Sequence, residues 1–137
     1  MEVSLIRCKT EGNSILIEFA GAGRPLWIQR SISSAIDEIK GTKAGIGGST
    51  PDEQIFTLHR ISLQTGDALF LLSDGYPDQF SESSRRKITT KRLKEKLEEM
   101  HSATMQEKCI LLEQYLINWQ GKFMQLDDIL VVGIGVR

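Results

Sequence analysis

The chain has 137 residues, of which 40% are hydrophobic and 26% charged, and its formal net charge at pH 7 is −1. These values fit one soluble globular domain and give no overall attraction to nucleic acid or to an anionic membrane. No apolar segment approaches the roughly 20 residues that cross a bilayer, and the first residues lack a signal-peptide pattern, so we expect a cytoplasmic protein.

The first part of the chain has the character of an antiparallel meander. Gly12-Asn13 is a predicted tight turn, and residues 41–52, with four glycines and a proline, are a predicted loop. Four short segments around them have strand-like sequences: residues 3–8, 14–20, 26–29 and 35–40.

Two further strands are predicted in the middle of the chain. Residues 54–62 alternate in the manner of a strand, and the turn at residues 65–67 leads into an apolar run that ends in Ser73-Asp74-Gly75. A run of this length and character is typical of a buried strand, so Asp74 is expected where the backbone leaves the sheet.

The sequence after Gly75 has the periodicity of helices. Leu93, Leu97 and Met100 recur at spacings of four and three residues, which predicts a helix whose start is capped by Thr89 or Thr90. An ion pair between Lys94 and Glu98 is expected on its outer face.

A second helix is predicted from about residue 104 to 120. Thr104 and Glu107 have the spacing of a capping box, and Gly121 is placed to end the helix. We assign its apolar stripe to packing against a sheet rather than to a cofactor: Met105, Cys109, Leu112, Leu116 and Trp119. The final strand is predicted at residues 129–136. Strands followed by helices indicate an α+β fold with the helices on one face of the sheet.

The cysteines and histidines show no pattern of a metal or catalytic site. Cys8 and Cys109 lie in neither a CxxC pair nor a zinc-type spacing, so we expect buried free thiols. His59 and His101 are expected in structural or surface positions. A locally basic segment is interpreted as a solvated helix face with its preceding loop, with a partner or phosphate-binding surface as the alternative: Arg85, Arg86, Lys87, Lys91, Arg92, Lys94 and Lys96.

Carboxylates at two strand ends are the candidate functional residues. Asp74 follows one apolar strand, and Asp127-Asp128 immediately precede the last one. Carboxylates held at strand ends and facing one cleft suit a hard divalent cation such as Mg²⁺ or Mn²⁺. The structural alternative is that Asp74 caps a turn or short helix, and that Asp127 and Asp128 are solvated turn residues.

The order of these elements resembles the C-terminal half of the SpoIIE-type serine/threonine phosphatases, a branch of the metal-dependent PPM phosphatase family. Four motifs in the family's order carry the resemblance: residues 19–26, 45–47, 66–75 and 125–132. The resemblance implies an antiparallel sheet covered by two helices, which is half of the family's two-sheet α/β/β/α sandwich. The resemblance also places Arg24 near the site, either as a surface residue or as one that steers a phosphate. The loop around Gly45 to Gly48 lies near the site as well, and we interpret it as a border of the active site rather than as a phosphate cradle.

The resemblance also implies a site and a reaction. Asp74 and Asp127 correspond to metal ligands, Gly75 to the turn that lets the backbone approach the metal cluster, and Asp128 to a supporting position. The cofactor is Mn²⁺ or Mg²⁺, with two or more ions in the complete domain. The reaction is hydrolysis of phosphoserine or phosphothreonine on regulatory proteins of the anti-anti-sigma type by a metal-activated water. No residue of the chain is assigned as catalytic.

One part of the family's pattern has no counterpart in the chain. The family's N-terminal half carries an Asp-Gly-x-Gly-His-Gly-like motif that supplies bridging metal ligands. We therefore expect residues 1–137 to be the C-terminal portion of one phosphatase domain, inactive or nearly so alone, and self-associating because strand edges and an apolar face are left open. The alternatives are a non-catalytic protein-interaction module with vestigial aspartates and, more weakly, an unrelated ligand-binding or metal-binding domain.

Overall fold

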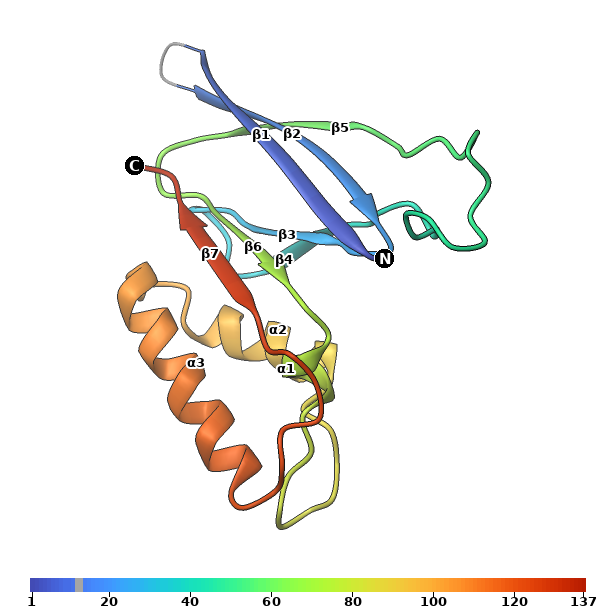
Figure 1. Ribbon diagram of the computed structural model, residues 1–137. Coiled ribbons are helices and arrows are strands. Elements are labelled where there is room, and N and C mark those ends of the chain that lie inside the picture. Colours follow the sequence, from blue (N-terminus) through green and yellow to red (C-terminus); the bar gives the residue numbers. More distant parts are fainter. Residues whose placement is uncertain (12–13) are drawn as a thin grey trace.

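The computed structural model describes residues 1–11 and 14–137, so the turn expected at Gly12-Asn13 lies outside the described residues. These residues form seven strands and three helices (Figure 1). In chain order they are β1 (Val3–Glu11), β2 (Ser14–Ala22), β3 (Leu26–Gln29), β4 (Ile36–Ile39), β5 (His59–Leu63), β6 (Ala68–Leu72), α1 (Gly75–Asp78), α2 (Thr90–Glu99), α3 (Met105–Gln120) and β7 (Val131–Gly135).

The strands form two antiparallel sheets, with orders β1-β2-β5 and β4-β3-β6-β7. The α+β fold expected from the sequence is therefore confirmed. The meander expected for the first strands is divided, because the chain passes from one sheet to the other between β2 and β3. Gly23, with a φ of +74°, lies in this crossing.

Two apolar cores join the layers in the order sheet, sheet, helices (Figure 1). Neighbouring residues of β6 face different cores: Leu69 packs between the sheets, and Phe70 packs under the helices. Because both faces of β6 are buried, its sequence is a continuous apolar run rather than an alternating one. The core between the sheets contains Ile17, Phe19, Leu26, Ile28, Leu63, Leu69 and Val136. The core under the helices contains Trp27, Ala68, Phe70, Tyr76, Ile88, Leu93, Leu97 and Leu112.

Local signals set the ends of the helices as expected. The Thr89 hydroxyl accepts a hydrogen bond from the Arg92 amide, and Thr104 and Glu107 form a capping box at the start of α3. Gly121 ends α3 with a φ of +56°.

The prediction of an ion pair between Lys94 and Glu98 is wrong. The Lys94 Nζ lies 2.6 Å from an oxygen of Glu38 on β4, and Glu98 accepts a hydrogen bond from the Ile36 amide. Because α2 packs beside β4, partners from the sheet are closer than the partner one helical turn away.

The expectation of buried thiols is also wrong, since Cys8 and Cys109 are both exposed. Cys8 lies on β1, which is an edge strand.

The strand expected at residues 54–62 begins only at His59, where pairing with β2 starts opposite Phe19. In the described part of the chain, no helix is both long enough and apolar enough to cross a bilayer. A cytoplasmic location remains a prediction.

Candidate metal-binding groove

Asp74 lies where β6 ends and α1 begins. It occupies the position before the first helical residue, but its side chain makes no capping hydrogen bond. Its Oδ2 instead lies 2.9 Å from a guanidinium nitrogen of Arg24, and the side chain is 49% exposed. The carboxylate therefore faces a groove rather than the helix terminus that the structural alternative required.

Ser73 holds the segment that carries Asp127 beside Asp74. The Ser73 hydroxyl donates to the Asp128 carbonyl at 2.7 Å and accepts from the Leu130 amide at 2.9 Å. The Ser73 amide donates to the Leu130 carbonyl at 2.9 Å. Through these bonds Asp74 and Asp127, far apart in the sequence, line one groove of about 510 Å³.

Gly75 is required by the close approach of the same segment. A Cβ atom at Gly75 would lie 2.3 Å from the Asp128 carbonyl oxygen and 3.1 Å from a side-chain carbon of Ile129. Asp128 contributes to this contact through its main chain. The sequence-derived role of Gly75 was an approach of the backbone to the metals, whereas the approach in the structure is between two protein segments.

Arg24 is the cation of the groove. Its guanidinium lies 2.6 Å from Glu2 and 2.9 Å from Asp74, and all three residues line the groove with Asp127. The hydrogen bond that Arg24 donates holds the pKa of the Asp74 carboxyl below its usual value. Glu2 has no motif around it, so no sequence pattern pointed to its place in this site.

Glycines fix the backbone of Arg24. A Cβ atom at Gly21 would lie 2.2 Å from the Arg24 carbonyl oxygen, and one at Gly41 would lie 2.4 Å from the same atom. The Glu2 side chain crosses Gly23, where a Cβ atom would lie 2.8 Å from its Oε1. Arg24 and Glu2 are therefore positioned by main-chain contacts that larger residues would disrupt.

The glycine-rich loop contacts the start of the chain. The Ile46 amide donates to the Met1 carbonyl at 2.7 Å, and the Met1 amino group donates to the Ile46 carbonyl at 3.0 Å. These bonds hold the residue that precedes Glu2 at the edge of the groove.

The described residues supply part of a metal site. Aspartate oxygens suit Mn²⁺ or Mg²⁺, which take mainly oxygen ligands. Within residues 1–11 and 14–137, however, no group of three or more His, Cys, Asp or Glu side chains is placed to hold a metal ion. Arg24 also occupies one side of Asp74. The donor set of these residues alone does not fit a complete dinuclear site.

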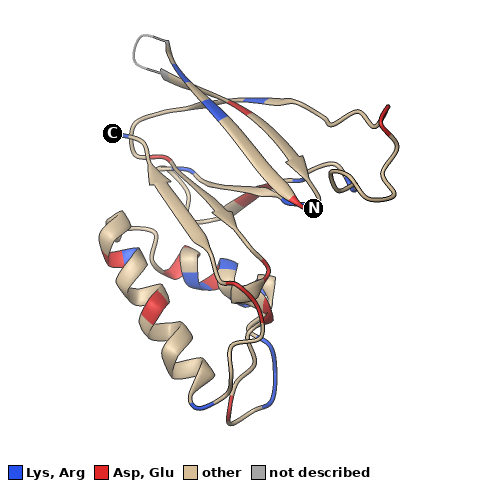
Figure 2. Cartoon of the chain, viewed as in Figure 1, with Lys and Arg blue, Asp and Glu red and all other residues tan. Residues whose placement is uncertain are grey.

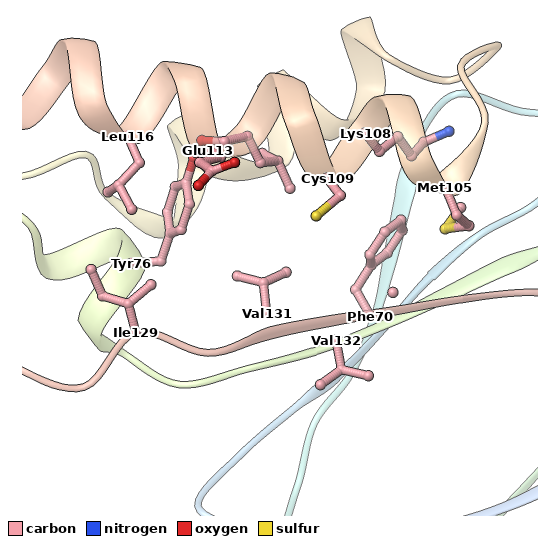
Figure 3. Close-up of a pocket in the computed structure, with 12 residues that line it drawn as sticks. Phe70, Tyr76, Met105, Lys108, Cys109, Glu113, Leu116, Ile129, Val131 and Val132 are labelled. Atoms are coloured by element: carbon pink, nitrogen blue, oxygen red, sulfur yellow. Dashed lines mark hydrogen bonds between the residues drawn. The ribbon is translucent and has the colours of Figure 1, made fainter.

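A larger cavity of about 570 Å³ lies between α3 and β7 (Figure 3). Met105, Cys109 and Leu116 line it from the helix, with Val131 opposite. Figure 3 shows the Cys109 sulfur pointing into this space, which explains its exposure. Neither Asp74 nor Asp127 lines the cavity. It belongs to the packing of α3, and the groove is the candidate site.

The family described as Stage II sporulation protein E (SpoIIE) matches residues 1–137. The chain belongs to the SpoIIE family. No curated protein sequence gives a significant match.

Solved structures similar to this SpoIIE-family chain confirm the fold. The SiaA-PP2C domain of Pseudomonas aeruginosa is 21% identical with a TM-score of 0.76, over 90% of this chain and 51% of that one. The SpoIIE phosphatase domain from Bacillus subtilis, presoaked with Mn, is 18% identical with a TM-score of 0.66, over 98% and 56%. The serine/threonine phosphatase PstP/Ppp of Mycobacterium tuberculosis is 16% identical with a TM-score of 0.57, over 97% and 59%. The chain thus spans little more than half the length of these structures.

Proposed function

We propose that this chain supplies part of the metal site of a phosphatase that hydrolyses phosphoserine or phosphothreonine on regulatory proteins. The observation that carries the proposal is the shared groove, in which Ser73 brings Asp74 and Asp127 together from two distant motifs. Asp74 and Asp127 would bind the cation, and the contact between Gly75 and the Asp128 main chain would keep them in register. No residue of the chain is assigned as catalytic.

The charges of the groove suit the chemistry of a phosphate monoester. Glu2, Asp74 and Asp127 are three carboxylates and Arg24 is one cation, so the groove attracts divalent metal ions. When bound, Mn²⁺ or Mg²⁺ lowers the pKa of water and neutralises charge on phosphoryl oxygens. The remaining ligands would come from outside the described residues, so we expect little or no activity from the chain alone. The proposed substrate is a phosphorylated regulatory protein of the anti-anti-sigma type, in a signalling role.

Isothermal titration with Mn²⁺ tests the proposal on the chain as it is. We expect binding by the wild type that is lost in Asp74→Ala, because the variant removes one of the two aspartate ligands. Asp37→Ala, which removes the same charge from an exposed residue of β4 outside the lining of the groove, is the matched control. Binding that survives Asp74→Ala would contradict the assignment of this aspartate.

A non-catalytic interaction module is the alternative function. The ion pair between Arg24 and Asp74 favours it, since an arginine holds one of the two aspartates. Under this alternative neither the wild type nor a chain with Arg24 replaced binds Mn²⁺. Robust, metal-dependent hydrolysis of para-nitrophenyl phosphate by the chain alone would contradict both the alternative and the expectation of a missing half.

We also propose that the chain associates with itself through the open side of its sheets. β1 and β7 are edge strands, and Figure 1 shows both at the front of their sheets. β7 contains no charged residue, and Leu130, Val132 and Ile134 are exposed at or beside it. An uncharged edge strand with exposed apolar side chains is a template for pairing with another chain.

Size-exclusion chromatography with light scattering tests this association. We expect a mass above that of one chain, rising with concentration, and a return to the monomer in Ile134→Lys, because a charge on the edge opposes strand pairing. Ile32→Lys, which replaces a 95% exposed isoleucine outside the strands, is the matched control. A clean monomer of the wild type at high concentration would contradict the proposal.

A further inference from the structure

The loop between α1 and α2 carries exposed cations. Arg85, Arg86 and Lys87 are all exposed, and Figure 2 shows positive charge along this loop. Lys87 pairs with Asp78 at 3.0 Å. Arg85 and Arg86 form no ion pair with any residue that the structure describes. The charge of the loop is therefore only partly compensated.

Two stacked rings support these cations. Phe80 and Phe123 lie with ring centroids 5.7 Å apart and an interplanar angle of 25°. The Arg85 guanidinium lies 5.5 Å from the Phe123 centroid, and the Lys87 ammonium lies 5.7 Å from the Phe80 centroid. Each ring thus holds one cation, which restricts side chains that are otherwise free on a solvated loop.

The loop itself is closed and attached to the segment that leads to Asp127. Phe80 and Lys87 form an antiparallel bridge, and inside it the Ser81 amide donates to the Arg86 carbonyl at 3.0 Å. Glu82 accepts a hydrogen bond from the Lys122 amide at 2.9 Å. These contacts fix the cations relative to the chain that runs toward the groove.

A surface connects Lys87, one of the three cations, to the candidate site. A hollow of about 150 Å³ has Lys87, Leu126 and Asp127 in its lining, and Asp127 also lines the groove. Met124 and Leu126 lie on the same segment and are 70% and 58% exposed. We call Arg85, Arg86, Lys87, Met124 and Leu126 together the basic ledge.

We propose that the basic ledge binds an acidic segment of the substrate protein next to its phosphorylated residue. This inference rests on the proposed phosphatase function and names a recognition surface for it. Arg85 and Arg86 would pair with carboxylates, while Met124 and Leu126 would contact apolar side chains between them. Because Asp127 lines both the hollow and the groove, a segment bound on the ledge would bring its phosphorylated residue to the edge of the groove.

The arrangement favours an acidic protein segment over a uniform polyanion. Glu82 lies on the loop, and Asp127 lies at the end of the ledge. Their carboxylates would repel the phosphates of a nucleic acid backbone or of an anionic bilayer. A protein segment can place carboxylates only opposite the arginines and apolar groups opposite Met124 and Leu126.

Fluorescence anisotropy on the chain in EDTA tests the ledge without metal. The probe is a labelled peptide with one phosphoserine flanked by glutamates and leucines, compared with the same peptide carrying glutamine in place of glutamate. We expect the acidic peptide to bind more tightly and the double variant Arg85→Gln, Arg86→Gln to weaken its binding about tenfold. The double variant Lys9→Gln, Lys43→Gln removes the same charge elsewhere and is expected to bind like the wild type.

Three results would overturn the inference: no preference for the acidic peptide, equal weakening in both double variants, or equal binding of single-stranded DNA or of vesicles with anionic lipid. The result is separable from the metal site, because peptide binding is measured in EDTA, without a metal ion, and Mn²⁺ binding is measured without the peptide. Peptide binding without Mn²⁺ binding would support the ledge and count against the proposed metal site. Mn²⁺ binding without peptide binding would do the reverse.

Discussion

Alanine at Gly75 is expected to lower the free energy of unfolding by about 2 to 3 kcal/mol, because the added Cβ overpacks a main-chain contact. The atom it would meet is the Asp128 carbonyl oxygen at 2.3 Å, which belongs to the backbone and has no rotamer to move into. Relief requires the segment at Asp128 to move away from the end of β6. We therefore expect Gly75→Ala to lose Mn²⁺ binding even though both aspartates are retained.

Urea denaturation and Mn²⁺ titration of the same sample measure the two effects. Gly47→Ala is the matched control, because Gly47 has a φ of +75° but no atom within 4 Å of its added Cβ. Gly47→Ala is expected to lower the free energy of unfolding by about 1 to 2 kcal/mol through backbone strain alone, without a clash. Wild-type stability and Mn²⁺ binding in Gly75→Ala would mean that the contact with Asp128 does not set the geometry of the groove.

Local and periodic signals in the sequence predicted most of the elements. The capping box at Thr104 and the glycine at the end of α3 act within one helical turn, so they can be recognised from the sequence without knowledge of the tertiary structure. The apolar run of β6 was equally clear, because burial on both faces removes the alternation that makes other strands ambiguous. The division into two sheets was not predicted, since strand patterns do not specify which strands pair.

The candidate site was predicted only in the residues that belong to motifs. Asp74 and Asp127 were found at strand ends, and the structure brings them into one groove. Glu2 was missed because it reaches the groove through the pairing of Met1 with Ile46, a contact between distant segments. The same reason explains Lys94, whose partner Glu38 lies on a strand rather than on its own helix.

The ion pairs of Arg24 lead to the second large effect. We expect Arg24→Gln to raise the affinity of the chain for Mn²⁺ about fivefold or more, because the variant removes a positive charge beside Asp74 and frees that carboxylate. Without metal, Glu2 and Asp74 lose the cation between them, so the melting temperature in EDTA is expected to fall. Added Mn²⁺ should restore it, since binding to the folded state stabilises that state.

Arg60→Gln is the control for Arg24→Gln, because Arg60 also pairs with a carboxylate, Glu18, on the outer sheet. It removes the same charge and is expected to leave Mn²⁺ affinity unchanged. A loss of Mn²⁺ binding in Arg24→Gln would mean that the arginine holds the two carboxylates in place for the metal. A gain would mean that it occupies Asp74 until a metal ion arrives. The direction of this one change therefore decides whether Arg24 is part of the metal site or its competitor.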